Sequence, residues 1–208
     1  MTNPKILSIE DPQALSAAKT VIQNHGTIVF PTDTIYGLAA DAYSTKGIQK
    51  IYEIKERPEE KALPVLIGEI AQLKKLILFI GDHVRQIAAA FWPGPLTLIL
   101  PKGPDVPPDL SPYPTIGVRM PNLAFTLELL QTLGPLATTS ANLSGGPNPM
   151  TAQDVIDQIG DRVDLILDGG STPGMTASTV VDATSTELKI LRPGPISLED
   201  LQSLFDRS

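Results

Sequence analysis

Residues 27–38 read TIVFPTDTIYGL, and this stretch sets the fold class that we expect for the chain. Its first four residues are β-branched or aromatic, which is typical of a buried strand. Pro31 ends the apolar run, and two threonines, an aspartate and a tyrosine follow it before Gly37. Polar side chains directly beyond a strand are well placed to bind a ligand, because α/β sheets bind ligands at strand ends. The same residues also suit an ordinary strand-to-turn transition, in which Thr and Asp are common.

Helical and strand patterns alternate on both sides of this stretch. Helices are predicted over residues 14–24, 44–55, 82–91, 123–133 and 197–205, and another opens at residues 151–154. Strands are predicted over residues 64–67, 96–100, 116–120, 136–139, 165–167, 178–181 and 188–191. Interleaved elements favour a layered α/β fold, and the short gaps between some strands favour a mixed sheet. We therefore expect an α/β fold with a twisted mixed parallel and antiparallel sheet, flanked by helices, in a single domain over residues 1–208.

Local capping signals mark several of the helix starts. Asp11 is expected to cap the first helix, with Pro12 at its first position. The helices that open at Thr151 and Ser197 each carry an aspartate three residues later, the spacing of a capping box.

Composition narrows the class of protein. Of the 208 residues, 42% are hydrophobic and 19% are charged, which suits a globular core and neither a disordered nor a membrane chain. The absence of cysteine excludes disulfides and thiolate chemistry, and the two histidines lack the paired spacing of a zinc site. A net charge of −7 argues against a protein whose main role is to bind duplex nucleic acid. Since no apolar run could span a bilayer and the N-terminus lacks a secretory signal, we expect a cytoplasmic protein.

Three cations follow closely at the end of the predicted helix 44–55. They are Lys55, Arg57 and Lys61, all within seven residues. The planar guanidinium of Arg57 and the point charge of Lys55 suit phosphate oxygens. The same cations also suit a solvated surface, where they complement the helix dipole and pair with neighbouring glutamates.

Two more polar features lie in predicted strands or directly after them. Residues 138–146, TTSANLSGG, end in glycines and could form an anion-binding nest or an ordinary polar turn, although they lack the P-loop pattern. Arg119 stands inside the apolar strand 116–120, where a charge is costly unless it is paired. Its partner would be either a structural carboxylate or the carboxylate of a ligand.

Together these segments resemble the YrdC-type threonylcarbamoyl-AMP synthase family over about residues 8–200. The motifs PTDTxYGL, KxRP, WPGPLT, VRMP, SANxSG, STVVD and RPG occur in that order. Each motif is weak alone, but their order is specific. The resemblance implies a YrdC-like fold with an open concave cavity. It also implies a nucleotidyltransferase that makes threonylcarbamoyl-AMP and pyrophosphate from L-threonine, bicarbonate or CO₂, and ATP, for threonylcarbamoyladenosine modification of tRNA.

The resemblance also assigns site residues. It gives Lys55 and Arg57 as catalytic, and we expect both on a solvated rim. The residues implied to bind ATP are Arg57, Lys61, Thr115, Ser140, Asn142, Asn148 and Arg192. Those implied to bind threonine are Thr34, Arg119, Thr138 and Ser178. Leu66 stands where some relatives have a histidine near threonine. Mg²⁺ is expected through the ATP phosphates, with no metal site built by the protein.

Two other functions compete with this interpretation. The chain could be a binding module for double-stranded RNA or tRNA, or a carbamoyl-transfer domain of the hydrogenase-maturation type. Under the main interpretation the product passes to the tRNA threonylcarbamoyl transferase, direct contact with tRNA is weak, and no membrane is involved.

Overall fold

The computed structural model describes residues 4–58, 60–174 and 176–205. Its strands are β1 (Lys5–Ser8), β2 (Ile28–Phe30), β3 (Gly37–Asp41), β4 (Val65–Leu66), β5 (Leu96–Pro101), β6 (Thr115–Arg119), β7 (Leu136–Ser140), β8 (Leu165–Asp168), β9 (Thr179–Asp182) and β10 (Lys189–Arg192). In the described part of the chain they form one ten-stranded sheet of order β1-β8-β2-β3-β7-β4-β6-β5-β9-β10. The β1–β8, β2–β8, β4–β6 and β5–β9 pairs are parallel. The remaining pairs are antiparallel, so the predicted mixed sheet is confirmed.

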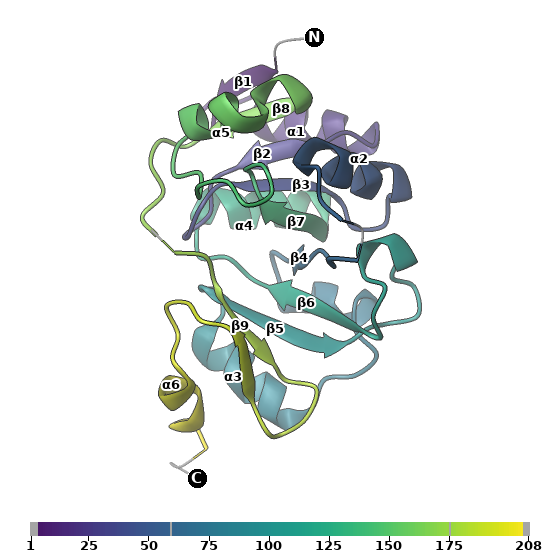
Figure 1. Cartoon of the computed structure of the whole chain (residues 1–208), viewed down its shortest axis with the longest axis vertical. Helices are drawn as coiled ribbons and strands as arrows, with labels where there is room; N and C mark the ends of the chain where they lie inside the picture. Colours follow the sequence, from purple (N-terminus) through teal and green to yellow (C-terminus); the bar gives the residue numbers. More distant parts are fainter. Residues whose placement is uncertain (1–3, 59, 175, 206–208) are drawn as a thin grey trace.

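Helices cover this sheet along its length. The α-helices are α1 (Ala14–Gln23), α2 (Thr45–Lys55), α3 (Asp82–Phe91), α4 (Ala124–Leu133), α5 (Ala152–Ile159) and α6 (Leu198–Gln202). Short 3₁₀ helices are η1 (Ile70–Lys75), η2 (Pro108–Leu110) and η3 (Gly160–Arg162). Figure 1 shows α1, α2 and α5 around the end of the sheet that carries β1, with α3 and α6 at the opposite end. Within the described residues, no helix combines the length and apolar character that crossing a bilayer requires.

The central strands are buried on both faces. Val29 and Leu38 pack on one face, in a cluster that includes residues of α2 and α5. Ile28 and Ala39, their neighbours along the strands, pack on the other face with α1 and α4. Burial on both faces explains why the strand Ile28–Phe30 is a continuous apolar run and does not alternate with polar residues.

Most predicted elements are confirmed within one or two residues, but β1 and β3 were not predicted. β3 begins at Gly37, inside the stretch that also suits a turn, and pairs with β2 and β7. Its sequence, GLAAD, lacks β-branched and aromatic residues, so propensity alone does not indicate a strand. Small residues suit the position because layers pack against both of its faces.

Helix starts follow the capping signals with one exception. The boxes at Thr151 and Ser197 form as predicted. The expected start of the first helix at Asp11 and Pro12 is wrong, because α1 begins at Ala14 after Gln13. Asp11 instead accepts the backbone N–H of Gln13 at 2.8 Å, in the turn that leads into the helix.

Successive side chains of β5 and β6 face opposite sides of the sheet, and one of these sides carries the polar residues Thr97 and Arg119. Leu96, Leu98 and Val118 point into the core on one side of the sheet. The intervening residues Thr97 and Arg119 face the opposite side, where they line a cavity.

Candidate functional site

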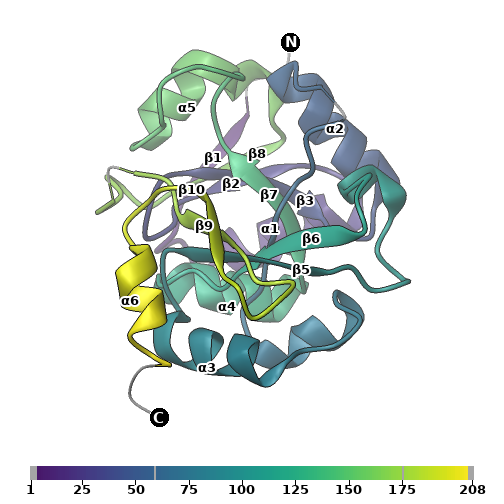
Figure 2. The ribbon, with the colours of Figure 1, turned by 60° about the horizontal axis from the view of Figure 1, so that its bottom comes forward.

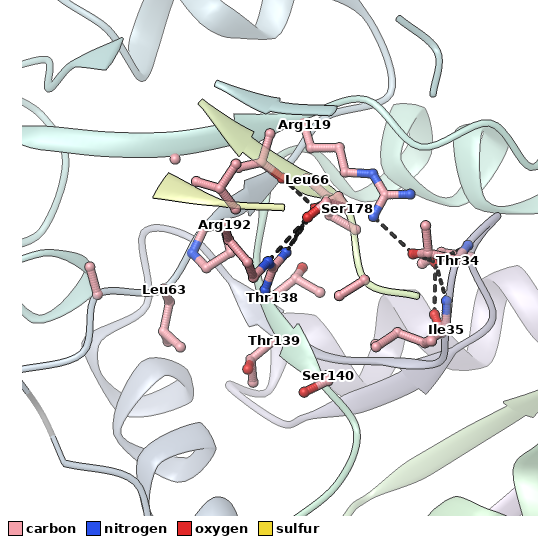
Figure 3. Close-up of a pocket in the computed structure, with 18 of the residues that line it drawn as sticks. Thr34, Ile35, Leu63, Leu66, Arg119, Thr138, Thr139, Ser140, Ser178 and Arg192 are labelled. Atoms are coloured by element: carbon pink, nitrogen blue, oxygen red, sulfur yellow. Dashed lines mark hydrogen bonds between the residues drawn. The ribbon is translucent and has the colours of Figure 1, made fainter. Parts of the chain in front are cut away.

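A cavity of about 370 Å³ lies against the face formed by β5, β6 and β7. Its other walls come from the segment after β2, the loop between α2 and β4, the residues before β9, and β10. Figure 3 shows side chains from these separate parts of the chain pointing toward a common space. Figure 2 shows β9 and β10 following β5 and β6 at one end of the sheet. The volume lies in the usual range for small-molecule sites.

Most of the site residues predicted from the sequence meet at this cavity. Those that line it are Thr34, Arg57, Arg119, Thr138, Ser140, Asn148, Ser178 and Arg192. Lys55, Lys61, Thr115 and Asn142 do not line it. Lys61 is exposed in the loop before β4, and Thr115 is the half-buried first residue of β6.

Lys55 lies behind the cavity wall, and the expectation that it is on a solvated rim is wrong. Its side chain is buried, with 2% exposure. The Nζ ammonium donates to the backbone oxygens of Ser140 and Asn142, and to Oδ1 of Asn142 at 3.1 Å. Ser140 Oγ donates to the same Oδ1 at 2.6 Å, and the Asn142 amide donates to Gly146 at 2.8 Å. Lys55 therefore fixes the turn that carries Ser140 into the cavity.

The burial of Lys55 predicts how stability depends on pH. Burial, with a smaller contribution from the Arg57 cation, lowers the pKa of Lys55 from 10.5 to about 8. Between pH 8 and 10.5 the unfolded chain then binds more protons than the folded protein, so this group makes the free energy of unfolding rise with pH. We expect wild type to gain about 3 kcal/mol relative to Lys55→Met across that window, measured by urea unfolding. A flat or falling difference would contradict the lowered pKa of Lys55.

Arg119 is paired with a structural carboxylate, one of the two partners that the sequence left open. It is 6% exposed, and it donates from Nε to the Gly94 oxygen at 3.0 Å and from Nη1 to Thr34 Oγ1 at 2.9 Å. Its Nη2 forms an ion pair with Asp33 at 2.5 Å. Burial lowers the pKa of Arg119, and the Asp33 carboxylate opposes that shift. Of its five N–H donors, two have no partner among the described residues, so a fixed cation is available at the cavity.

Asp33 supports the site through its ion pair with Arg119, a role that the sequence interpretation does not predict. It lies inside the quoted TIVFPTDTIYGL stretch, next to Thr34. The available signal was the cost of burying Arg119, since a buried guanidinium needs a carboxylate partner.

Arg192 and Ser178 form a second polar group on the wall (Figure 3). Arg192 donates to the Ser178 backbone oxygen from Nε at 3.1 Å and from Nη2 at 2.7 Å. Its Nη2 also donates to Ser178 Oγ at 3.0 Å, and that Oγ lies 2.8 Å from Thr97 Oγ1. These bonds hold one guanidinium of β10 against the residue that precedes β9.

Arg57 supplies a third cation. It donates to the backbone oxygens of Lys61 at 3.2 Å and Ala62 at 3.1 Å, which folds the loop after α2 onto itself. None of the described residues lining the cavity is acidic, whereas three are arginines. The lining therefore favours an anionic ligand.

The donor set does not suit a metal ion bound by protein side chains alone. In the part of the chain that the structure describes, no group of three or more His, Cys, Asp or Glu residues could hold a metal. Asp33, which precedes the cavity-lining Thr34, is already paired with Arg119.

Known proteins resemble this chain over most of its length. A family model described as Sua5/YciO/YrdC, telomere recombination, matches residues 20–194. The threonylcarbamoyl-AMP synthase of Bacillus subtilis is 40% identical over 205 residues, covering 96% of this chain and 58% of that protein. The mouse threonylcarbamoyl-AMP synthase is 34% identical over 205 residues, covering 94% of this chain and 71% of that protein.

A solved structure extends the likeness to three dimensions. The crystal structure of Pyrococcus abyssi Sua5 complexed with L-threonine aligns with a TM-score of 0.90 at 35% sequence identity. The alignment covers 98% of this chain and 60% of that one.

Proposed function

The chain belongs to the Sua5/YciO/YrdC family, and from that premise we propose that it is a threonylcarbamoyl-AMP synthase. It forms threonylcarbamoyl-AMP and pyrophosphate from L-threonine, bicarbonate or CO₂, and ATP. One observation carries the proposal: the buried Arg119 and the phosphate-type cations Arg57 and Arg192 share a single cavity. The product serves threonylcarbamoyladenosine modification of tRNA and passes to the tRNA threonylcarbamoyl transferase in the cytoplasm.

The amino acid binds at the Arg119 end of the cavity in this proposal. The two remaining N–H groups of Arg119 receive the carboxylate, because charge-assisted bonds from a fixed guanidinium are strong and directional. Hydroxyls of Thr34 and Thr138 lie on the same wall, together with the apolar side chains of Ile35 and Leu66. Leu66 therefore presents an apolar surface where some relatives present a histidine.

The triphosphate binds at the Arg57 and Arg192 end. Ser140 and Asn148 line the same cavity and provide neutral donors. Lys61, whose backbone oxygen holds Arg57, is exposed and can reach a phosphate that extends out of the cavity. We assign Thr115 to contact with the outer part of ATP, and Asn142 to supporting Ser140. Mg²⁺ arrives with the ATP phosphates, because the described lining offers it no carboxylate.

The reaction then needs positioning and charge neutralisation. The threonine nitrogen forms a bond to the carbon of CO₂ and loses a proton, which gives a carbamate. A carbamate oxygen attacks the α-phosphorus, and the bond from that phosphorus to the bridging oxygen of pyrophosphate breaks. Arg57 and Arg192 offset the charge that develops on the phosphates, and holding both substrates in one cavity removes the entropy cost of bringing them together.

The direct test is mass spectrometry of a reaction containing the protein, ATP, L-threonine and bicarbonate. We expect threonylcarbamoyl-AMP and stoichiometric pyrophosphate, and neither when any substrate is omitted. A module for double-stranded RNA or tRNA would release no pyrophosphate. A carbamoyl-transfer domain would instead form an adenylate from carbamoyl phosphate without threonine.

Gly194 lies so close to the backbone of Ser178 and Thr179 that a larger residue should disturb the Arg192 side of the site. A Cβ at this position would lie 2.4 Å from the Thr179 nitrogen and 2.7 Å from the Ser178 carbonyl carbon, so the chain must shift away from Ser178. Because that shift breaks the Arg192 bonds, we expect Gly194→Ala to lower kcat/KM for ATP by at least about tenfold. Gly160→Ala is the control, since the three atoms nearest to its Cβ belong to the Ile156 side chain, at 3.3 Å or more. Equal kinetics of the two variants would contradict the role of this close approach.

A further inference from the structure

Thr97 forms a hydrogen bond at the cavity wall to which the proposed function gives no role. It lies in the middle of β5, is 4% exposed, and has its Oγ1 2.8 Å from Ser178 Oγ. Ser178 is also 4% exposed, and its Oγ accepts from Arg192 Nη2 at 3.0 Å. Both residues line the cavity. Three side chains from β5, the segment before β9, and β10 thus form one hydrogen-bonded chain.

Counting the protons and lone pairs of these three side chains shows whether a hydroxyl remains free to donate to a ligand. A hydroxyl has one proton and two lone pairs, whereas the Arg192 guanidinium only donates. The two hydroxyls together hold two protons, and one is used in the bond between them. Neither hydroxyl has another acceptor among the described residues. One O–H is therefore left to donate into the cavity.

The positive charge of Arg192 decides whether Ser178 or Thr97 donates to the ligand. The N–H of Arg192 polarises the Ser178 hydroxyl and makes it the stronger donor of the two. A strong donor pairs best with an anionic oxygen, so Ser178 donates to the ligand and Thr97 donates to Ser178. Both lone pairs of Ser178 are then occupied, and it cannot accept from the ammonium group of an amino acid.

We propose that Thr97 is a positioning residue of the amino-acid site, which holds Ser178 as a hydrogen-bond donor to an anionic oxygen of the substrate. This inference rests on the proposed function. The oxygen belongs either to the carboxylate of threonine or to the carbamate formed from its amine. Thr97 acts through Ser178 and does not itself contact the reacting atoms.

Thr97→Val and Thr97→Ser separate the hydroxyl from the shape of the side chain. Valine keeps the volume and loses the donor, whereas serine keeps the donor and loses the methyl group. We expect Thr97→Val to lower kcat/KM for threonine about tenfold, with the KM for ATP within twofold of wild type, and Thr97→Ser to stay within twofold throughout. In a Ser178→Ala background, Thr97→Val should have no further effect, because its partner is already gone.

Calorimetry with L-threonine alone identifies the oxygen. If Thr97→Val weakens this binding as much as it lowers kcat/KM, the acceptor is the carboxylate. If binding is unchanged and only turnover with bicarbonate and ATP falls, the acceptor is the carbamate.

Three results would overturn the inference: wild-type kinetics in Thr97→Val, equal losses in Thr97→Val and Thr97→Ser, or additive losses with Ser178→Ala. Failure of the proposed function is distinguishable from these, because the wild-type protein would then form no threonylcarbamoyl-AMP at all.

Discussion

Lys55→Met is expected to lower threonylcarbamoyl-AMP formation by at least about a hundredfold, and to destabilise the protein by about 2–4 kcal/mol. Methionine keeps most of the stem but removes the ammonium that serves the backbone oxygens of Ser140 and Asn142 and the side chain of Asn142. Three buried acceptors then lose their shared donor, and unsatisfied buried acceptors are costly. Without this support, the turn no longer holds Ser140 at the cavity wall. Steady-state kinetics and urea unfolding measure the two effects separately.

The same helix provides the control. Lys50 lies five residues earlier in α2. Its ammonium is 3.8 Å from Asp164, and both side chains are more than 40% exposed. An exposed ion pair contributes little to stability, so Lys50→Met should stay close to wild type in both measurements. If Lys55→Met were equally mild, Lys55 would not support the site.

Arg119→Lys is expected to lower kcat/KM for threonine by about two to three orders of magnitude. The guanidinium forms three directed bonds, to Gly94, Thr34 and Asp33, and still has N–H groups for a carboxylate. Lysine retains the charge, but its three donors on one nitrogen cannot reproduce this fork. The substitution also leaves buried acceptors without partners, so we expect a loss of about 2 kcal/mol in the free energy of unfolding.

Arg85→Lys is the matched control, because Arg85 forms an exposed ion pair with Asp82 at 3.6 Å on the surface of α3. It should change neither threonine dependence nor stability measurably.

Competition between threonine and its carboxamide analogue tests whether Arg119 binds the carboxylate. Wild type should discriminate strongly against the amide, and Arg119→Lys should lose most of that discrimination. Unchanged discrimination would remove Arg119 from the carboxylate site.

Local signals in the sequence were sufficient where the physical cause is local. The capping boxes at Thr151 and Ser197 depend on residues three positions apart, and both form as predicted. β3 was not predicted because its strand character comes from its neighbours β2 and β7 and from packing on both of its faces. Small residues such as those of GLAAD carry no strand preference of their own.

In the candidate site, too, the sequence predicts what has a local cause and misses what depends on distant parts of the chain. Motif order indicates which residues gather at the cavity, but not the direction in which each side chain points. Lys55 illustrates the limit: a lysine at the end of a helix suits a solvated rim, yet its acceptors lie 85 and 87 residues further along the chain. Thr97 ends the WPGPLT motif and is a single hydroxyl in an apolar strand, but neither feature indicates what it contacts. Its partner, Ser178, is 81 residues away.

The position of β8 between β1 and β2 has a consequence for biosynthesis. β8 pairs with both of those strands in parallel, although it follows them by more than 130 residues. Until residue 168 has left the ribosome, the outer edge of β2 has no hydrogen-bonding partner from this sheet. Such non-local pairings slow folding and leave strand edges open to other chains. The nascent polypeptide must therefore keep its first strands from aggregating until β8 has been translated.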